Sequence, residues 1–116
     1  MKRVLLVEDD PLIRECVNEI LTEHNYEVAL TERADNAVEI ISQNHPDVVL
    51  MDLQLQIGDG VLATKQIKDT ETIRNIPVIL FSAKDNIRSL VDQTGADGYI
   101  AKPFEITDLL TILAQF

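Results

Sequence analysis

The chain has 116 residues, 46% of them hydrophobic, which suits one domain with a single core and excludes a disordered segment. Twenty acidic against ten basic residues give a formal net charge of −10, which argues against direct nucleic-acid binding and favours cations and basic partner surfaces. The single cysteine excludes an internal disulfide, and the lack of a membrane-length apolar run or a signal-like N-terminus predicts a cytoplasmic protein without membrane insertion.

Five short apolar runs alternate along the chain with five stretches that carry apolar residues at helical spacing. Unbroken apolar runs are typical of strands that are buried on both faces of a sheet. The runs lie at residues 4–7, 28–30, 48–51, 78–81 and 99–101. The apolar stripes of the five predicted helices are Ile13, Cys16, Val17, Ile20 and Leu21; Ala34, Ala37, Val38 and Ile41; Leu62, Ala63, Gln66 and Ile67; Ile87, Leu90 and Val91; and Ile106, Leu109, Leu110, Leu113 and Phe116.

Polar residues mark where two of these helices begin. Asp10 before Pro11 predicts a helix start, with the aspartate as N-cap and the proline at the first helical position. We expect Asp85 to cap the fourth helix in the same way. Cys16 lies on the apolar stripe of the first helix, so we expect a buried thiol rather than a reactive one.

Strict alternation of strands and helices predicts an α/β fold, a parallel sheet with helices on both faces and right-handed crossovers. Five such units over residues 1–116 fit one flavodoxin-like (βα)5 domain with the strand order 2-1-3-4-5. In that order the first and third strands flank the point where the winding reverses. Ligands of such sheets bind there, outside the carboxyl ends of the strands.

Five polar residues stand at the carboxyl ends of the predicted strands. Glu8 and Asp9 follow the first strand, Asp52 ends the third, Ser82 the fourth and Lys102 the fifth. The topology therefore predicts that three carboxylates, a hydroxyl and an ammonium converge on one site. Carboxylates at the ends of buried strands are unfavourable unless a cation or a proton compensates them.

The residue types at this site favour phosphoryl chemistry on a hard cation. Oxygen ligands without nearby histidine or cysteine suit Mg²⁺, with Mn²⁺ or Ca²⁺ as alternatives, and a site of few carboxylates leaves room for waters and phosphate oxygens. Lys102 and Ser82 offer a positive charge and a hydrogen-bond donor to an anion. Asp52 beside them can attack a phosphoryl group and hold it as an acyl phosphate. His24 and His45 adjoin no motif, and we expect them on the surface at helix ends.

Six segments together resemble the receiver domain of bacterial two-component response regulators. They are Leu5-Leu6-Val7-Glu8-Asp9-Asp10, Val48-Val49-Leu50-Met51-Asp52-Leu53, Asp59-Gly60, Val78-Ile79-Leu80-Phe81-Ser82-Ala83, Gly95-Ala96-Asp97-Gly98-Tyr99 and Lys102-Pro103-Phe104. Each segment alone is weakly specific, but all six in order at the spacing of one domain are very specific. The resemblance covers the whole chain and implies a single domain like the chemotaxis regulators, acting as a phosphorylation-operated switch.

The resemblance implies roles for the acids. Asp52 would accept a phosphoryl group from a histidine kinase or a histidine phosphotransfer protein, in a two-component system or phosphorelay. The domain would be no enzyme toward other substrates and would catalyse only its own Mg²⁺-dependent phosphorylation and dephosphorylation. Glu8, Asp9, Asp52 and the backbone carbonyl of Gln54 would organise the Mg²⁺ ion.

The resemblance also implies how the signal leaves the site. Lys102 and Ser82 would bind the phosphoryl oxygens, the Lys102-Pro103 peptide would be cis, and Ser82 and Tyr99 would form the switch. The surface of the fourth helix, fifth strand and fifth helix would change, and with it the binding of a downstream protein or of a second copy in a homodimer. Neither partner protein is identified by the sequence.

Three positions depart from the family pattern or tune it. Gln56 lies four residues after Asp52, where the family usually has proline, so the stiffness of this loop is left open. Gln54 and Lys84 occupy positions that tune dephosphorylation in the family, and their combination gives no rate.

Several alternatives stay open. A pseudo-receiver would act as a constitutive interaction module; loss of an acid, the acceptor or the lysine would mark it, and none is lost. A phosphohydrolase of the haloacid-dehalogenase type needs a second aspartate two residues after the nucleophile, where this chain has Gln54. Ser82 can be a helix cap and Tyr99 plain strand packing, and Ile112 and Phe116 can belong to the core or to a contact face. The sequence equally suits a stand-alone receiver or part of a longer regulator.

Overall fold

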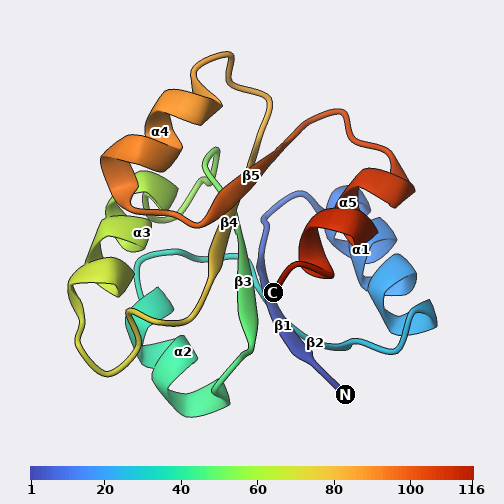
Figure 1. Ribbon diagram of the computed structural model, residues 1–116, viewed down its shortest axis with the longest axis horizontal. Coiled ribbons are helices and arrows are strands. Elements are labelled where there is room, and N and C mark those ends of the chain that lie inside the picture. Colours follow the sequence, from blue (N-terminus) through green and yellow to red (C-terminus); the bar gives the residue numbers. More distant parts are fainter.

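The computed structural model describes residues 1–116 as five strands and five helices in strict alternation (Figure 1). The strands are β1 (Arg3–Val7), β2 (Glu27–Thr31), β3 (Val48–Asp52), β4 (Val78–Ser82) and β5 (Gly98–Ala101). The helices are α1 (Pro11–Glu23), α2 (Ala37–Asn44), α3 (Gly60–Asp69), α4 (Ile87–Thr94) and α5 (Ile106–Leu113). All neighbouring strands are parallel and their order is β2-β1-β3-β4-β5, so the predicted flavodoxin-like fold is confirmed.

The sheet separates two apolar clusters, each covered by its own helices. On one face Leu5 and Val7 of β1 belong to a cluster of 15 buried residues that α2, α3 and α4 cover. On the other face Val4 and Leu6 belong to a cluster of 12 buried residues that α1 and α5 cover, the two helices on the right of Figure 1. Successive side chains of a strand point to opposite faces, which explains why the central strands need unbroken apolar runs.

Local hydrogen bonds fix where the helices begin. The Asp10 carboxylate accepts a bond from the Leu12 N–H at 2.9 Å, as predicted for the start of α1. Asp59 caps α3 in the same way by accepting from the Val61 N–H at 2.9 Å. The predicted cap of α4 by Asp85 is wrong, because Asn86 holds the cap position and makes no side-chain cap bond there.

The prediction of a buried Cys16 is also wrong, since this side chain is exposed. Val17, Ile20 and Leu21 pack α1 onto the sheet, whereas Cys16 lines a hollow of about 510 Å³ between α1 and the segment after β5. That segment, with Phe104, does not close over the sulfur. The apolar stripe of a helix predicts which side of the helix faces the core, but it does not predict how far the neighbouring segments cover that side.

The remaining open positions lie in the core or at helix ends. Ile112 and Phe116 are half-buried and pack against the cluster of the α1 and α5 face, which favours their core interpretation. His24 and His45 are exposed and end α1 and α2, as expected. None of the helices is long and apolar enough to cross a membrane.

Candidate functional site

Three acids meet where β1 and β3 leave the sheet. The two strands are paired with Val7 opposite Met51, so the next residues, Glu8 and Asp52, emerge side by side. One carboxylate oxygen from each of Glu8, Asp9 and Asp52 lies within 4.8 Å of the others. Glu8 and Asp52 are 0% and 2% exposed, whereas Asp9 is half-buried. The predicted convergence of the three acids is therefore confirmed; we call them the acid cluster.

Lys102 reaches into the acid cluster from the end of β5. Its Nζ donates to Glu8 Oε1 at 2.8 Å and lies 3.4 Å from Asp52 Oδ1. The ammonium also lies 4.4 Å from the centroid of the Phe81 ring, a cation–π distance. The backbone N–H of Lys102 donates to the Ser82 carbonyl at 2.9 Å, which extends the β4–β5 ladder by one bond. The Lys102-Pro103 peptide is cis, as predicted.

The acid cluster carries more negative charge than Lys102 can balance. Burial, helped by the neighbouring Asp52 carboxylate and opposed by Lys102, raises the pKa of Glu8 to about 7. Near neutral pH a proton on Glu8 therefore relieves part of the repulsion. A divalent cation can do the same, and the donor set fits one, because hard carboxylate oxygens without histidine or cysteine are the ligands of Mg²⁺ and its relatives.

The segment between β3 and α3 lies against the acid cluster through two backbone amides that sequence reasoning missed. The Gln54 N–H donates to Asp52 Oδ1 at 3.0 Å, and the Gln56 N–H donates to Asp9 Oδ2 at 2.9 Å. Backbone donors carry no side-chain signal, so only the fold reveals them. The Gln54 carbonyl, a predicted metal ligand, belongs to this same segment.

Ser82 and Tyr99 lie on the neighbouring strands. Ser82 is fully buried at the end of β4, and its hydroxyl accepts a bond from the Lys84 N–H at 3.1 Å, which leaves the hydroxyl proton for another acceptor. Tyr99 is half-buried on β5, and its hydroxyl accepts from the Arg88 guanidinium of α4 at 3.2 Å. Sequence reasoning gave no role to Arg88.

A polar hollow opens beside the acid cluster. Its volume is about 410 Å³ and its lining is Asp9, Asp10, Pro11, Gln54 and Gln56. The lining contains no apolar side chain other than the proline ring, so water and charged groups can enter. This hollow connects the Asp9 side of the acid cluster to solvent.

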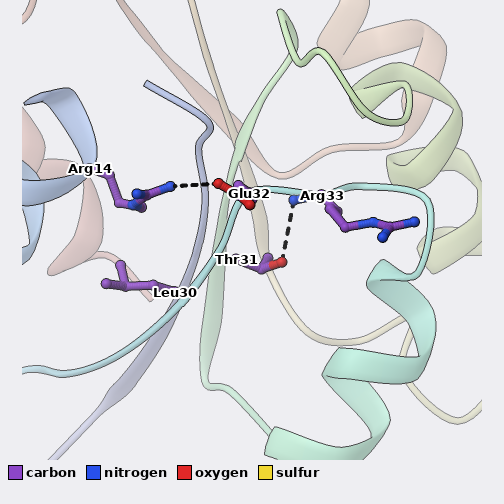
Figure 2. Close-up of a pocket in the computed structure, with 5 residues that line it drawn as sticks. All are labelled: Arg14, Leu30, Thr31, Glu32 and Arg33. Carbon is purple, nitrogen blue, oxygen red and sulfur yellow. Dashed lines mark hydrogen bonds and ion pairs between the residues drawn. The ribbon is translucent and has the colours of Figure 1, made fainter. Parts of the chain in front are cut away.

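A second hollow, of about 400 Å³ at the end of β2, is lined by two arginines, and both form ion pairs (Figure 2). Figure 2 shows Arg14 reaching Glu32, 3.3 Å away, while the side chain of Arg33 points in another direction. Arg33 pairs with Asp35 at 2.6 Å and holds the pKa of that carboxyl below its usual range. Because both arginines are already neutralised, the acid cluster remains the better candidate site.

Comparisons with known proteins agree with this geometry. The family model described as the response regulator receiver domain matches residues 4–114. The chain is 36% identical over 113 residues to the phosphate regulon transcriptional regulatory protein PhoB of Escherichia coli, covering 94% of this chain but 48% of PhoB. It is 31% identical to the polar-differentiation response regulator DivK of Brucella ovis, covering 99% of this chain and 95% of DivK.

A solved structure adds a detailed likeness. The receiver domain of the sensor histidine kinase PA1611 from Pseudomonas aeruginosa, with a magnesium ion coordinated in its active site cleft, superimposes with a TM-score of 0.89 at 33% identity. The match covers 98% of this chain and 95% of that one. The chain spans about half the length of PhoB and nearly all of DivK. Its fold, its acid cluster and the match over residues 4–114 establish that the chain belongs to the response regulator receiver domain family.

Proposed function

We propose that residues 1–116 form one receiver domain that acts as a phosphorylation-operated switch, with Asp52 as the phosphoacceptor. The observation that carries this proposal is the placement of Asp52, 2% exposed at the end of β3, with Lys102 3.4 Å from its Oδ1. A buried carboxylate beside an ammonium and two further acids suits charge-balanced group transfer better than a structural role.

In the proposed reaction an oxygen of the Asp52 carboxylate attacks phosphorus. The new oxygen–phosphorus bond forms an acyl phosphate, and the bond from phosphorus to the donor breaks with its electron pair leaving on the donor atom. The Lys102 ammonium and the Ser82 hydroxyl proton stabilise the charge on the phosphoryl oxygens. Hydrolysis of the acyl phosphate by water returns Asp52 to a carboxylate and releases the phosphoryl group as inorganic phosphate.

Glu8, Asp9, Asp52 and the Gln54 carbonyl are the residues that would hold Mg²⁺, and Mn²⁺ can take its place on the same oxygen ligands. A cation bound there would neutralise charge that develops on the phosphoryl oxygens. The magnesium ion in the receiver of PA1611 supports this assignment. Glu8 and Asp9 then serve to bind the cation and not to transfer protons.

We propose a histidine kinase or a histidine phosphotransfer protein as the donor. The output is a change in the face formed by α4, β5 and α5, through Ser82 and Tyr99, which alters binding to a downstream protein or to a second copy of the chain. The likeness to PhoB, DivK and the PA1611 receiver supports these partner classes without naming the individual proteins.

Treatment with acetyl phosphate tests the acceptor. With Mg²⁺ present, the native chain should gain the mass of one phosphoryl group, and Asp52→Asn should gain none, because an amide oxygen cannot form the acyl phosphate. Loss of labelling when Mg²⁺ is chelated is the control for the cation.

Labelling of Asp52→Asn at another residue would show that the acceptor is a different side chain. A native chain that takes no label from acetyl phosphate or from any kinase, yet still binds a partner, would instead favour the pseudo-receiver.

A further inference from the structure

The segment between β3 and α3 is attached to the acid cluster by a long-range backbone bond. The Gln56 N–H donates to Asp9 Oδ2 at 2.9 Å, joining residues that are 47 positions apart in the sequence. The neighbouring bond from the Gln54 N–H to Asp52 is local, since it spans two residues and only tightens the turn after β3. Gln56 is therefore the point where the segment that follows β3 contacts Asp9, the acid that follows β1.

Asp9 depends on this contact more than the other two acids depend on theirs. Glu8 and Asp52 are held by burial and by Lys102, at 2.8 and 3.4 Å. Asp9 is half-buried, forms no ion pair, and accepts one hydrogen bond, the one from Gln56. Without that donor the Asp9 carboxylate would be free to rotate into the open polar hollow that it lines.

The donor itself is held in place from the far end of the segment. The Ala34 N–H donates to the Ile57 carbonyl at 3.2 Å, and Arg33 and Ile57 form a parallel bridge. Gly58 has a φ of +90°, and a Cβ there would lie 2.5 Å from the Asp35 nitrogen, so only glycine allows the segment to pass this close. The position of the Gln56 amide is thus set before any cation binds.

We infer that the Gln56 backbone N–H is a positioning group for the cation site: it fixes Asp9 Oδ2 and leaves Oδ1 available as a ligand. This inference rests on the proposed function of the acid cluster. A carboxylate has lone pairs on both oxygens, so one amide bond orients it without using up its ligand capacity. Groups that orient metal ligands in this way typically contribute a factor of about 10 to 100 in metal affinity.

The same bond couples the cation to the segment. If fixing Asp9 favours the cation, a bound cation must favour the ordered segment by the same factor. The side chain of Gln56 takes no part, because the donor is the main chain. Any residue with a backbone N–H can therefore serve at position 56, and proline cannot.

Three variants at position 56 test this inference with Mg²⁺ alone as the probe. Gln56→Ala keeps the N–H, Gln56→Pro removes it, and replacing the Gln56 amide by an ester, through the matching α-hydroxy acid, removes it without adding a ring. Mg²⁺ affinity is measured by NMR titration, and the free energy of unfolding is measured without Mg²⁺. We expect the ester and proline chains to bind Mg²⁺ about 10 to 100 times more weakly than the native chain, and the alanine chain to bind within twofold of it.

The outcomes separate positioning from simple structural support. A merely structural role would lower the metal-free unfolding energy of the ester chain and leave its Mg²⁺ affinity unchanged, which overturns the inference. Weak binding by the proline chain alone overturns it as well, since the ring and not the missing donor would be responsible. If the native chain binds no Mg²⁺, the proposed metal site itself is contradicted. This result differs from failure of the positioning role, because the native chain and all three variants would then show the same lack of binding.

Discussion

Two lysine–carboxylate clusters lie at opposite ends of β5. Only one of them is balanced, in the sense that one lysine charge meets one carboxylate charge. Before the strand, Asp97 Oδ2 accepts from the Lys68 Nζ at 2.7 Å and from the Val78 N–H at 2.8 Å. Lys68 Nζ also donates to the carbonyls of Ile76 at 2.9 Å and Arg74 at 3.1 Å. One ammonium with all three protons donated meets one carboxylate, so nothing at this end is left for a ligand.

After the strand, Lys102 meets two buried carboxylates, Glu8 and Asp52, with Asp9 beside them. The Lys68 and Lys102 side chains are each 15% exposed, so burial of the lysine does not distinguish the clusters. The carboxylates do: the Asp97 side chain is 35% exposed, whereas those of Glu8 and Asp52 are 1% and 2% exposed, and only around Lys102 is there a surplus of negative charge. In a structural ion pair the two charges neutralise each other. In a functional site some charge stays uncompensated, and here the uncompensated negative charge can bind a cation.

Removal of Lys102 should have the largest effect on stability. In Lys102→Met without Mg²⁺ at pH 8, Glu8 and Asp52 face each other buried without a cation, and the free energy of unfolding should fall by about 3 kcal/mol. Millimolar Mg²⁺ should restore much of that loss, because the cation replaces the missing charge. Urea denaturation with and without Mg²⁺ measures both; a loss that Mg²⁺ leaves untouched would contradict the surplus-charge interpretation.

Protonation of Glu8 should produce the next largest effect. Its pKa is about 7 in the folded chain against an ordinary value of 4.5, so between these two pH values the folded state holds a proton that the unfolded state has lost. The stability from this group is complete below pH 4.5 and is lost as pH rises through 7, by on the order of 3 kcal/mol. Comparison of Mg²⁺-free unfolding of the native chain and Glu8→Gln over this range isolates the effect, which Glu8→Gln should lack. A parallel pH dependence in both proteins would show that Glu8 titrates normally.

Removal of Lys68 is the matched control at the balanced cluster. Lys68→Met loses three hydrogen bonds, but Asp97 is 35% exposed and keeps the Val78 N–H, so we expect a loss of about 1 kcal/mol. Mg²⁺ should not restore it, and labelling of Asp52 by acetyl phosphate should stay at the native level. Urea denaturation and mass spectrometry check these two expectations. A Mg²⁺-dependent loss in this variant would abolish the contrast between the clusters.

Sequence reasoning reached the fold and the acid cluster because both depend on patterns along the strands. Unbroken apolar runs that end in Glu8, Asp52 or Lys102 predict buried strands, and parallel topology brings their carboxyl ends together. The Lys68–Asp97 cluster has no such signal, since it joins a helix to a loop 29 residues away. Lys68 has all its protons donated only because it also bonds to two backbone carbonyls, and backbone carbonyls leave no signal in the sequence.

Other details depended on packing between neighbouring segments. Cys16 is exposed because the segment after β5 stops short of it, and no helical pattern records where a neighbour ends. The Gln56 donor belongs to the main chain, so the departure from the family's usual proline gave only an open question about loop stiffness. In the structure the backbone N–H of Gln56, which a proline would lack, donates a hydrogen bond to Asp9.

The smallest expected effect concerns β5, which joins the balanced cluster to the unbalanced one. A beryllofluoride mimic of the phosphoryl group adds acceptors at the end of β4, and the free hydroxyl proton of Ser82 can reach one only if Ser82 moves inward. That movement leaves space that Tyr99 can fill, after its 3.2 Å bond with Arg88 breaks. Because Lys68 holds the Asp97 end, the response should increase along β5 toward Lys102.

Amide hydrogen exchange with and without beryllofluoride measures this gradient in the native chain and in Ser82→Ala. We expect a few-fold change in exchange over residues 85–94 and 99–116 of the native chain, little change at Asp97, and a reduced response in Ser82→Ala, since the alanine cannot donate to the mimic. Equal responses in the two proteins would show that Ser82 is not the coupling residue. A response as large at Asp97 as at Lys102 would mean that the balanced cluster also moves, and that β5 shifts as a unit instead of pivoting on its fixed end.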